Sequence, residues 1–126
     1  MSRFRSERGA AAVEFALVLP ILVAVLLGIV EFGRAYNAQI TITHAAREAA
    51  RTMAVQDDPA AARTAARNAA PSLNPALTDA QINVAPADCT AGATTTITVQ
   101  HNVTFISGWF GPGVNLTGTA AMRCGG

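Results

Sequence analysis

The feature that most constrains this chain is an apolar run near its N-terminus, residues 10–30, in which Glu14 is the one ionisable side chain. A helix needs roughly 20 apolar residues to cross a bilayer, so the run predicts a membrane-spanning helix. A secretory signal peptide is the alternative. Its apolar region is shorter, roughly 7–15 residues, and ends at a small-residue cleavage site. The segment that follows here, residues 31–36, is not such a site.

The arginines of the leader, residues 1–9, predict the orientation of the span. Arg3, Arg5 and Arg8 precede the apolar run directly. Basic flanks are retained on the cytoplasmic side of a membrane, so we expect the N-terminus inside and the rest of the chain outside.

The helix is expected to continue beyond the membrane, over residues 31–56. No strong helix breaker follows Gly33, and Ile40, His44 and Arg47 recur at helical spacings. A helix of this length would project a stalk about as long as the span itself.

The remaining segment, 57–126, predicts a small α+β extracytoplasmic domain. Asp58 and Pro59 have the chemistry of an N-cap and a first helical residue, which indicates a short second helix up to about Ala70. β-branched or alternating segments separated by Pro, Gly and Asp then predict a three-stranded antiparallel sheet. The expected strands are residues 81–84, 94–105 and 116–122.

The longest expected strand has two distinct faces. Side chains alternate across a strand, so every second residue shares a face. One face would pack against the helix and the other would meet water or a partner. The first face consists of Thr95, Ile97, Val99, His101, Val103 and Phe105.

The two cysteines, Cys89 and Cys124, are 35 residues apart, and the second follows the last expected strand. An extracytoplasmic compartment is commonly oxidising, so we expect a disulfide that joins the end of the chain to the domain. Free thiols and pairing between chains are the alternatives.

Signals for catalysis or ligand binding are lacking in the sequence. His44 and His101 are not at ligand spacing from cysteines or paired carboxylates, and there is no nucleophile motif or phosphate-binding glycine loop. No broad basic face for nucleic acid is expected. We therefore expect no enzymatic activity, metal, cofactor, nucleic-acid partner or small-molecule substrate. Trp109 and Phe110 form an aromatic loop that either contacts a partner or covers the small core.

The junction of leader and span carries a family resemblance. A glycine after a basic leader, four mostly small residues and a Glu-Phe pair at the start of an apolar helix resemble the processing motif of type IV pilin-like proteins. Here these residues are Gly9, Ala10, Glu14 and Phe15. Residues 16–22 and 28–34 look more specifically like the TadE-like pseudopilins of the tight-adherence (Flp) pilus machinery, and residues 116–122 are similar to that family's last strand.

The resemblance implies cleavage between Gly9 and Ala10 by a prepilin peptidase, which leaves Ala10 as the new N-terminus. Glu14 could then pair with the α-amino group of Ala10 in its own or a neighbouring chain and set axial register during assembly. The alternative is that Glu14 simply lies at headgroup level.

Three further residues of the span bear on helix packing. Pro20 removes a backbone hydrogen bond and should kink or loosen the helix, which either helps subunits to pack or has no consequence. Ala24 and Gly28 form a small-xxx-small pair that would let a second helix approach closely.

The resemblance thus implies a processed minor pilin, or pseudopilin, that acts as a structural or assembly component of a type IVb pilus. We expect a single-pass protein of the bacterial cytoplasmic membrane, with incorporation into the filament or its tip left open. Its expected partners are the prepilin peptidase, other pilins and pseudopilins, and the pilus assembly platform. The alternative is an uncleaved, membrane-anchored binding module of the cell envelope.

Overall fold

A computed structural model describes the backbone of residues 2–125 and the side chains of residues 7–125. The elements in chain order are α1 (Ser2–Gln56), α2 (Pro59–Ala69), the short 3₁₀ helix η1 (Asp79–Gln81), β1 (Ile82–Ala85), β2 (Thr94–Thr104) and β3 (Gly113–Arg123). A long apolar helix, a short second helix and a three-stranded antiparallel sheet confirm the predicted α+β class. Met1 of the predicted leader and Gly126 of the predicted domain lie outside the described residues.

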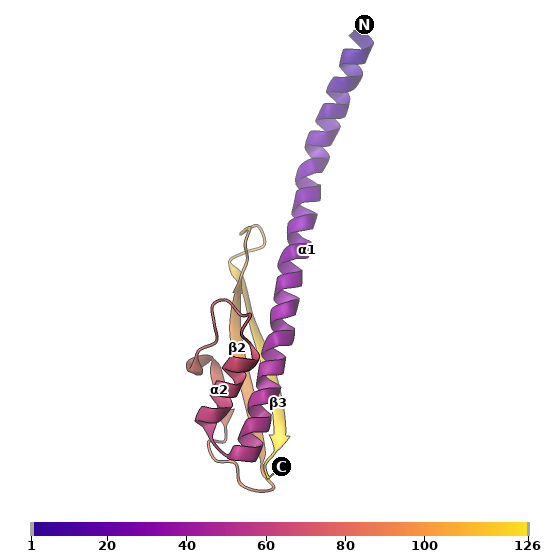
Figure 1. Ribbon diagram of the computed structural model, residues 1–126. Helices are drawn as coiled ribbons and strands as arrows, with labels where there is room; N and C mark the ends of the chain where they lie inside the picture. The colour runs from indigo at the N-terminus through magenta and orange to yellow at the C-terminus, as the bar shows by residue number, and fades with distance from the viewer. Residues whose placement is uncertain (1, 126) are drawn as a thin grey trace.

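Helix α1 is a single rod of 55 residues, about 82 Å long at about 1.5 Å per residue. It begins at Ser2 instead of at the start of the apolar run, and the leader contains no proline that would interrupt it. It also continues through Pro20 without interruption (Figure 1). The helix ends where Asp57 adopts a left-handed φ of 51° and donates its N–H to the carbonyl of Met53 at 2.9 Å.

Helix α2 begins as predicted, because the Asp58 carboxylate accepts the N–H of Ala60 at 3.0 Å and Pro59 occupies the first turn. Its contact with α1 is made largely by alanine. Small side chains let the two helix backbones approach closely, so a core forms without large residues. The fully buried alanines are Ala45, Ala46, Ala49 and Ala50 on α1 and Ala62 and Ala66 on α2.

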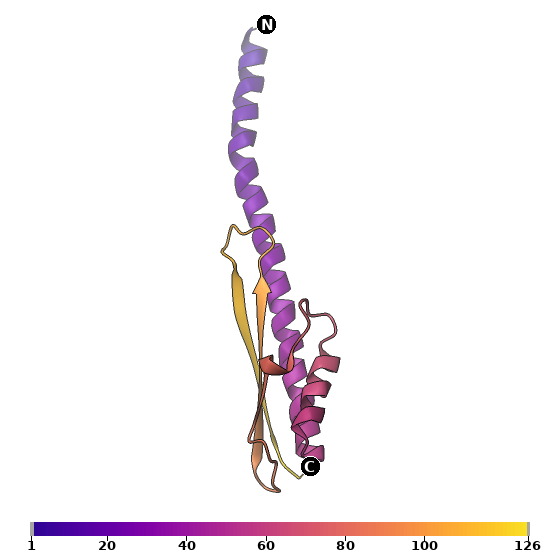
Figure 2. The same ribbon diagram turned by 90° about the vertical axis from the view of Figure 1, so that its left-hand side faces the viewer.

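The sheet has the order β1-β2-β3, with β2 in the middle and both pairs antiparallel. The predicted alternation of β2 is confirmed, since Thr95, Ile97, Val99, His101 and Val103 are all buried. Phe105, just beyond the strand, is half-buried. Both helices cover this same face of the sheet, and the opposite face is open (Figure 2).

The first half of α1 projects beyond α2 and the sheet, which pack against the second half (Figures 1 and 2). Large apolar side chains along the projecting half are exposed on every side of the helix. The segment Glu7–Gln56 is long and apolar enough to cross a membrane by length and composition. An apolar helix that is exposed all round fits a membrane anchor.

Candidate functional site

The predicted processing segment lies on the projecting part of α1, away from the folded domain. Gly9, Ala10, Glu14 and Phe15 are all exposed. A Cβ placed on Gly9 would meet no atom within 4 Å, so the fold itself does not require glycine at this position. Among the residues whose side chains are described, Glu14 forms no hydrogen bond or salt bridge, so its carboxylate is open to a partner outside this chain.

The small residues of the span, Ala24 and Gly28, lie beside Phe110 of the same chain. Gly28 faces the ring of Phe110, and a Cβ at Gly28 would lie 3.4 Å from the Cζ atom of that ring. Ala24 and Gly28 line an open apolar groove on α1 together with Phe110. Close approach of a second helix to this pair stays a prediction.

A buried carboxylate joins α1 to the loop that connects β2 and β3 (residues 105–112), called the β2–β3 loop below. Glu31 is 1% exposed, and its Oε1 accepts the N–H of Ile106 at 2.8 Å. Three residues further along α1, the guanidinium of Arg34 donates to the carbonyl of Thr104 at 3.2 Å. The two bonds hold the start of the loop against the helix just beyond the apolar run.

Glu31 has no role predicted from the sequence, although it lies within residues 28–34, one of the segments that carry the family resemblance. Its position was the available signal, because it is the first ionisable residue after an apolar run that could span a membrane. An acidic residue at such a position is normally expected to face the headgroups. The structure instead buries it against the loop.

The aromatic pair lies at the tip of the β2–β3 loop. Trp109 is 59% exposed and Phe110 is 45% exposed, so neither ring is part of the buried core between helices and sheet. The loop extends from the domain along α1 towards its N-terminal half (Figures 1 and 2). This exposure does not fit the expectation that the pair covers the small core.

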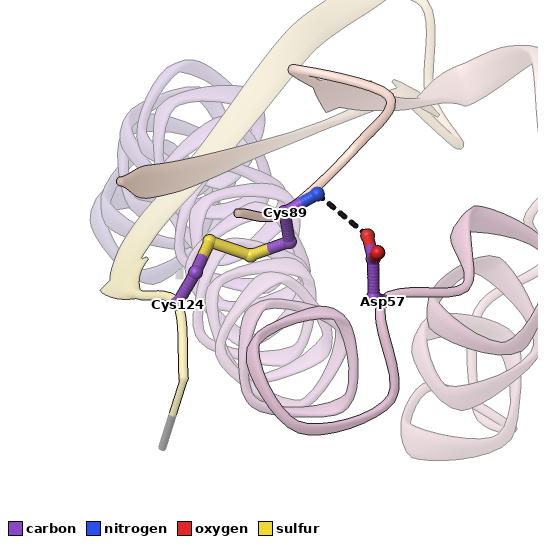
Figure 3. Close-up of a disulfide and its surroundings, with 3 residues drawn as sticks. All are labelled: Asp57, Cys89 and Cys124. Carbon is purple, nitrogen blue, oxygen red and sulfur yellow. Dashed lines mark hydrogen bonds between the residues drawn. A yellow bond between two sulfur atoms is a disulfide. The ribbon is translucent and has the colours of Figure 1, made fainter. Parts of the chain in front are cut away.

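At the other end of the domain, a disulfide and two hydrogen bonds join separate parts of the chain (Figure 3). A disulfide joins Cys89 to Cys124, whose Cα atoms are 5.5 Å apart. The N–H of Cys89 donates to Oδ1 of Asp57 at 2.5 Å, and the N–H of Gly125 donates to the carbonyl of Ala54 at 3.2 Å. The end of α1, the segment before β2 and the end of the chain therefore meet at one point.

The histidines occupy unlike environments. His44 is exposed on α1, whereas His101, on the helix-facing side of β2, is 2% exposed, and its Nδ1 has no hydrogen-bond partner among the described residues. Burial lowers the pKa of His101 below its ordinary value of 6.5. His101 lines a small pocket of about 130 Å³ together with Arg34 and Asn37. Within residues described by the structure, no three His, Cys, Asp or Glu side chains are grouped so as to hold a metal ion.

These observations define a class of protein: a small α+β domain carried on one long helix whose exposed apolar half fits a membrane anchor. A family model described as TadE-like protein matches residues 9–51, a range that begins at Gly9 and ends within the part of α1 covered by the domain. The match confirms the family resemblance predicted from the sequence. The TadE-like family suggests a pilin-like protein associated with the Tad pilus. Neither a curated protein nor a solved structure matches the chain.

Proposed function

We propose that this chain is a structural or assembly subunit of a tight-adherence (Flp) pilus, anchored with its N-terminus in the cytoplasm and processed after Gly9 by a prepilin peptidase. In this role it is the substrate of a processing enzyme, and it catalyses no reaction itself. Its partners are the peptidase, other pilins and pseudopilins, and the assembly platform. The observation that carries the proposal is the TadE-like match over the exposed segment that contains Gly9, Glu14 and the apolar span.

The environment of Gly9 supports processing at that residue. Glycine inside a helix costs roughly 0.5–1 kcal/mol relative to alanine. Gly9 lies inside α1, yet no neighbouring atom would touch a side chain there. A requirement for glycine at this position would therefore come from outside the chain, and recognition by a processing peptidase would be such a requirement.

The stalk part of α1 supports assembly with other subunits. Phe32, Tyr36 and Ile40 follow one another at intervals of four residues, so they share one face of the helix. Their side chains are 71%, 71% and 53% exposed. A stripe of this kind, continuous with the apolar span, is suited to packing against the α1 helix of another pilin-like chain.

The test is the mature N-terminus of the protein, measured by mass spectrometry of membrane fractions with and without the co-resident prepilin peptidase. We expect an N-terminus at Ala10 that depends on the peptidase. The variant Gly9→Leu should stay uncut, and it should fold normally because the added side chain meets no neighbour. Gly33→Leu is the matched control, since Gly33 is also inside α1 with no atom near its Cβ position, and it should be cut normally.

A chain that keeps its original N-terminus in the presence of an active peptidase would contradict processing. The uncleaved, membrane-anchored binding module would then become the better explanation of the same fold. Cleavage of Gly9→Leu at an unchanged rate would show that the peptidase, if it acts, does not act at this glycine.

A further inference from the structure

The β2–β3 loop (residues 105–112) is apolar and exposed, which is unusual for the tip of a hairpin in water. Ile106 is 67% exposed, and Trp109 and Phe110 are 59% and 45% exposed. No residue of the loop carries a charge. Loop tips that face water are normally built from small and polar residues, so the composition of this one calls for an apolar or interfacial environment.

Three contacts fix the height of the loop along α1. Ile106 donates its N–H to Glu31, and Thr104 accepts a hydrogen bond from Arg34. The ring of Phe110 lies over Gly28, one turn closer to the N-terminus of the helix than Glu31. The loop is therefore held beside the end of the apolar run, with its aromatic tip directed towards the run.

The length of the apolar run indicates how deep in the membrane the loop would lie. Gly28 lies about 27 Å along the helix axis from Ala10 at about 1.5 Å per residue, and the hydrocarbon of a bilayer is roughly 30 Å thick. If the basic leader holds Ala10 at the cytoplasmic surface, Gly28 still lies inside the outer edge of the hydrocarbon. A ring that rests on Gly28 must then enter the same layer.

The apolar surface is also continuous from helix to loop. Phe110 lines one open groove with Val25, Ile29 and Phe32 of α1, side chains that are themselves largely exposed. The polar contacts of Glu31 and Arg34 begin on the far side of Phe110, where the headgroups would lie. In both the helix and the loop, apolar side chains lie at the level of Phe110, and polar contacts lie at the level of Glu31 and Arg34.

We propose that the β2–β3 loop inserts into the outer leaflet of the cytoplasmic membrane, with Phe110 at the edge of the hydrocarbon and Trp109 at headgroup level. Tryptophan favours this level because its ring is apolar and its indole N–H can still meet a polar partner. The occupant of this surface is thus lipid. The inference rests on α1 as the membrane anchor, and it adds a second attachment point that would fix the orientation of the domain on the bilayer.

Trp109 is the only tryptophan of the chain, so its fluorescence reports on the loop alone. The experiment places the full-length protein in vesicles of phosphatidylethanolamine and phosphatidylglycerol. We expect a blue-shifted emission, protection from aqueous acrylamide, and quenching by lipids brominated close to the headgroup. Lipids brominated near the chain end should quench less. Phe110→Ser should reduce the lipid quenching of Trp109, since it removes the ring that faces the hydrocarbon.

Two control variants separate the loop from the anchor, each in a Trp109→Phe background. Leu22→Trp places the probe in the middle of the span, and it should be quenched best by the deeply brominated lipids. Thr117→Trp places it on the open face of the sheet, and it should be quenched by acrylamide and not by lipid.

The inference is overturned if Trp109 behaves like the Thr117→Trp probe while the Leu22→Trp probe is quenched by lipid, because the anchor would then stand without an inserted loop. It is also overturned if Trp109 is shielded without lipid quenching and the shielding depends on the ratio of protein to lipid, since the loop would then contact a second copy. Failure of the Leu22→Trp probe to enter lipid would contradict the anchor, and with it the proposed function.

Discussion

At the scale of single residues, an ionisable side chain within an apolar span has an energetic cost that some partner should reduce. Glu14 is such a side chain, and it has no partner among the residues whose side chains are described. An acidic residue costs about 2.5–3.5 kcal/mol at the centre of a membrane helix and less towards the interface. An α-amino group created at Ala10 by cleavage would lie about one helical turn away. It would be close enough to pair with the Glu14 carboxylate and so reduce this cost.

We therefore predict that Glu14→Ala leaves cleavage intact and impairs assembly. The variant should show the same mature N-terminus at Ala10 as the original protein, and less of it should co-purify with the other pilus subunits. Glu7→Ala is the control, because Glu7 would be removed with the leader and should affect neither result. Normal co-purification of Glu14→Ala would assign the carboxylate to the headgroup region without a role in register.

His101 should give the domain a pH-dependent stability. Its pKa in the folded protein lies below the ordinary value of 6.5, because burial disfavours the charged ring. Arg34 lines the same pocket, and a second cation there would not favour protonation either. Between the folded and unfolded pKa values the unfolded chain binds more protons, so stability rises with pH in that window.

The prediction is that the domain loses stability as the pH falls below about 6.5, the unfolded pKa of histidine. His101→Leu should remove this pH dependence with little loss at neutral pH, since the unpartnered Nδ1 is removed with the ring. The measurement is the thermal unfolding midpoint in detergent at several pH values. His44→Gln, at an exposed position, should keep the dependence, and an equally strong dependence in His101→Leu would assign it to other groups.

At the scale of elements, β3 approaches the backbone of α1 closely at Gly118. A Cβ at this position would lie 2.9 Å from the backbone carbonyl of Ile42 and from the N atom of Thr43. Backbone atoms in the middle of a helix cannot move aside as a flexible side chain can. The strand therefore lies this close to the helix only because residue 118 has no side chain.

We expect Gly118→Ala to destabilise the domain by about 1–3 kcal/mol, the usual cost of an overpacked contact. Denaturant unfolding of the domain in detergent measures this loss. Gly33→Ala is a control of opposite sign, since its Cβ meets nothing and alanine is favoured in helices by roughly 0.5–1 kcal/mol. A neutral Gly118→Ala would mean that β3 can shift away from α1 at little cost.

The elements themselves could be predicted from local patterns. Residues 10–30 are apolar for the length of a membrane span, and β2 alternates with a period of two, so each pattern specifies its own element. The strand around Gly118 was also expected, but its contact with Ile42 was not. Glu31 and Ile106 are likewise 75 residues apart in the chain, and no local pattern records which distant residues will meet.

The packing of α1 against α2 could not be predicted from the sequence either. A sequence rich in alanine predicts helix but not which helices will touch, because alanine has high helix propensity and little side chain to mark a face. Helices α1 and α2 pack together, and both carry fully buried alanines such as Ala46, Ala49 and Ala62. Their role follows only from the position of one helix relative to the other.

At the scale of the whole molecule, the domain is attached to α1 at two places. Near the apolar span, Glu31 and Arg34 hold the β2–β3 loop. At the far end, the disulfide and the bonds to Asp57 and Ala54 hold the end of the chain. The sheet between these places is only three strands wide, so its small core depends on both attachments.

The disulfide should account for much of the stability at the far end. A cross-link across 35 residues contributes on the order of 3–4 kcal/mol in the chain-entropy model. We predict that replacing both cysteines with serine, Cys89→Ser with Cys124→Ser, lowers the free energy of unfolding by about this amount. The original protein treated with a reductant should lose a similar amount, measured by denaturant unfolding of the domain in detergent.

The two attachments are at opposite ends of the domain, so a variant that loses the disulfide and still folds should keep the attachment at Glu31. The double serine variant should keep the lipid quenching of Trp109 and the mature N-terminus at Ala10, because neither the Glu31–Ile106 bond nor the exposed processing segment contacts the disulfide. An unfolding midpoint equal to that of the original protein would show that packing of α1, α2 and the sheet suffices. Loss of the Trp109 signal in a variant that is still folded would show instead that the two ends are coupled through α1.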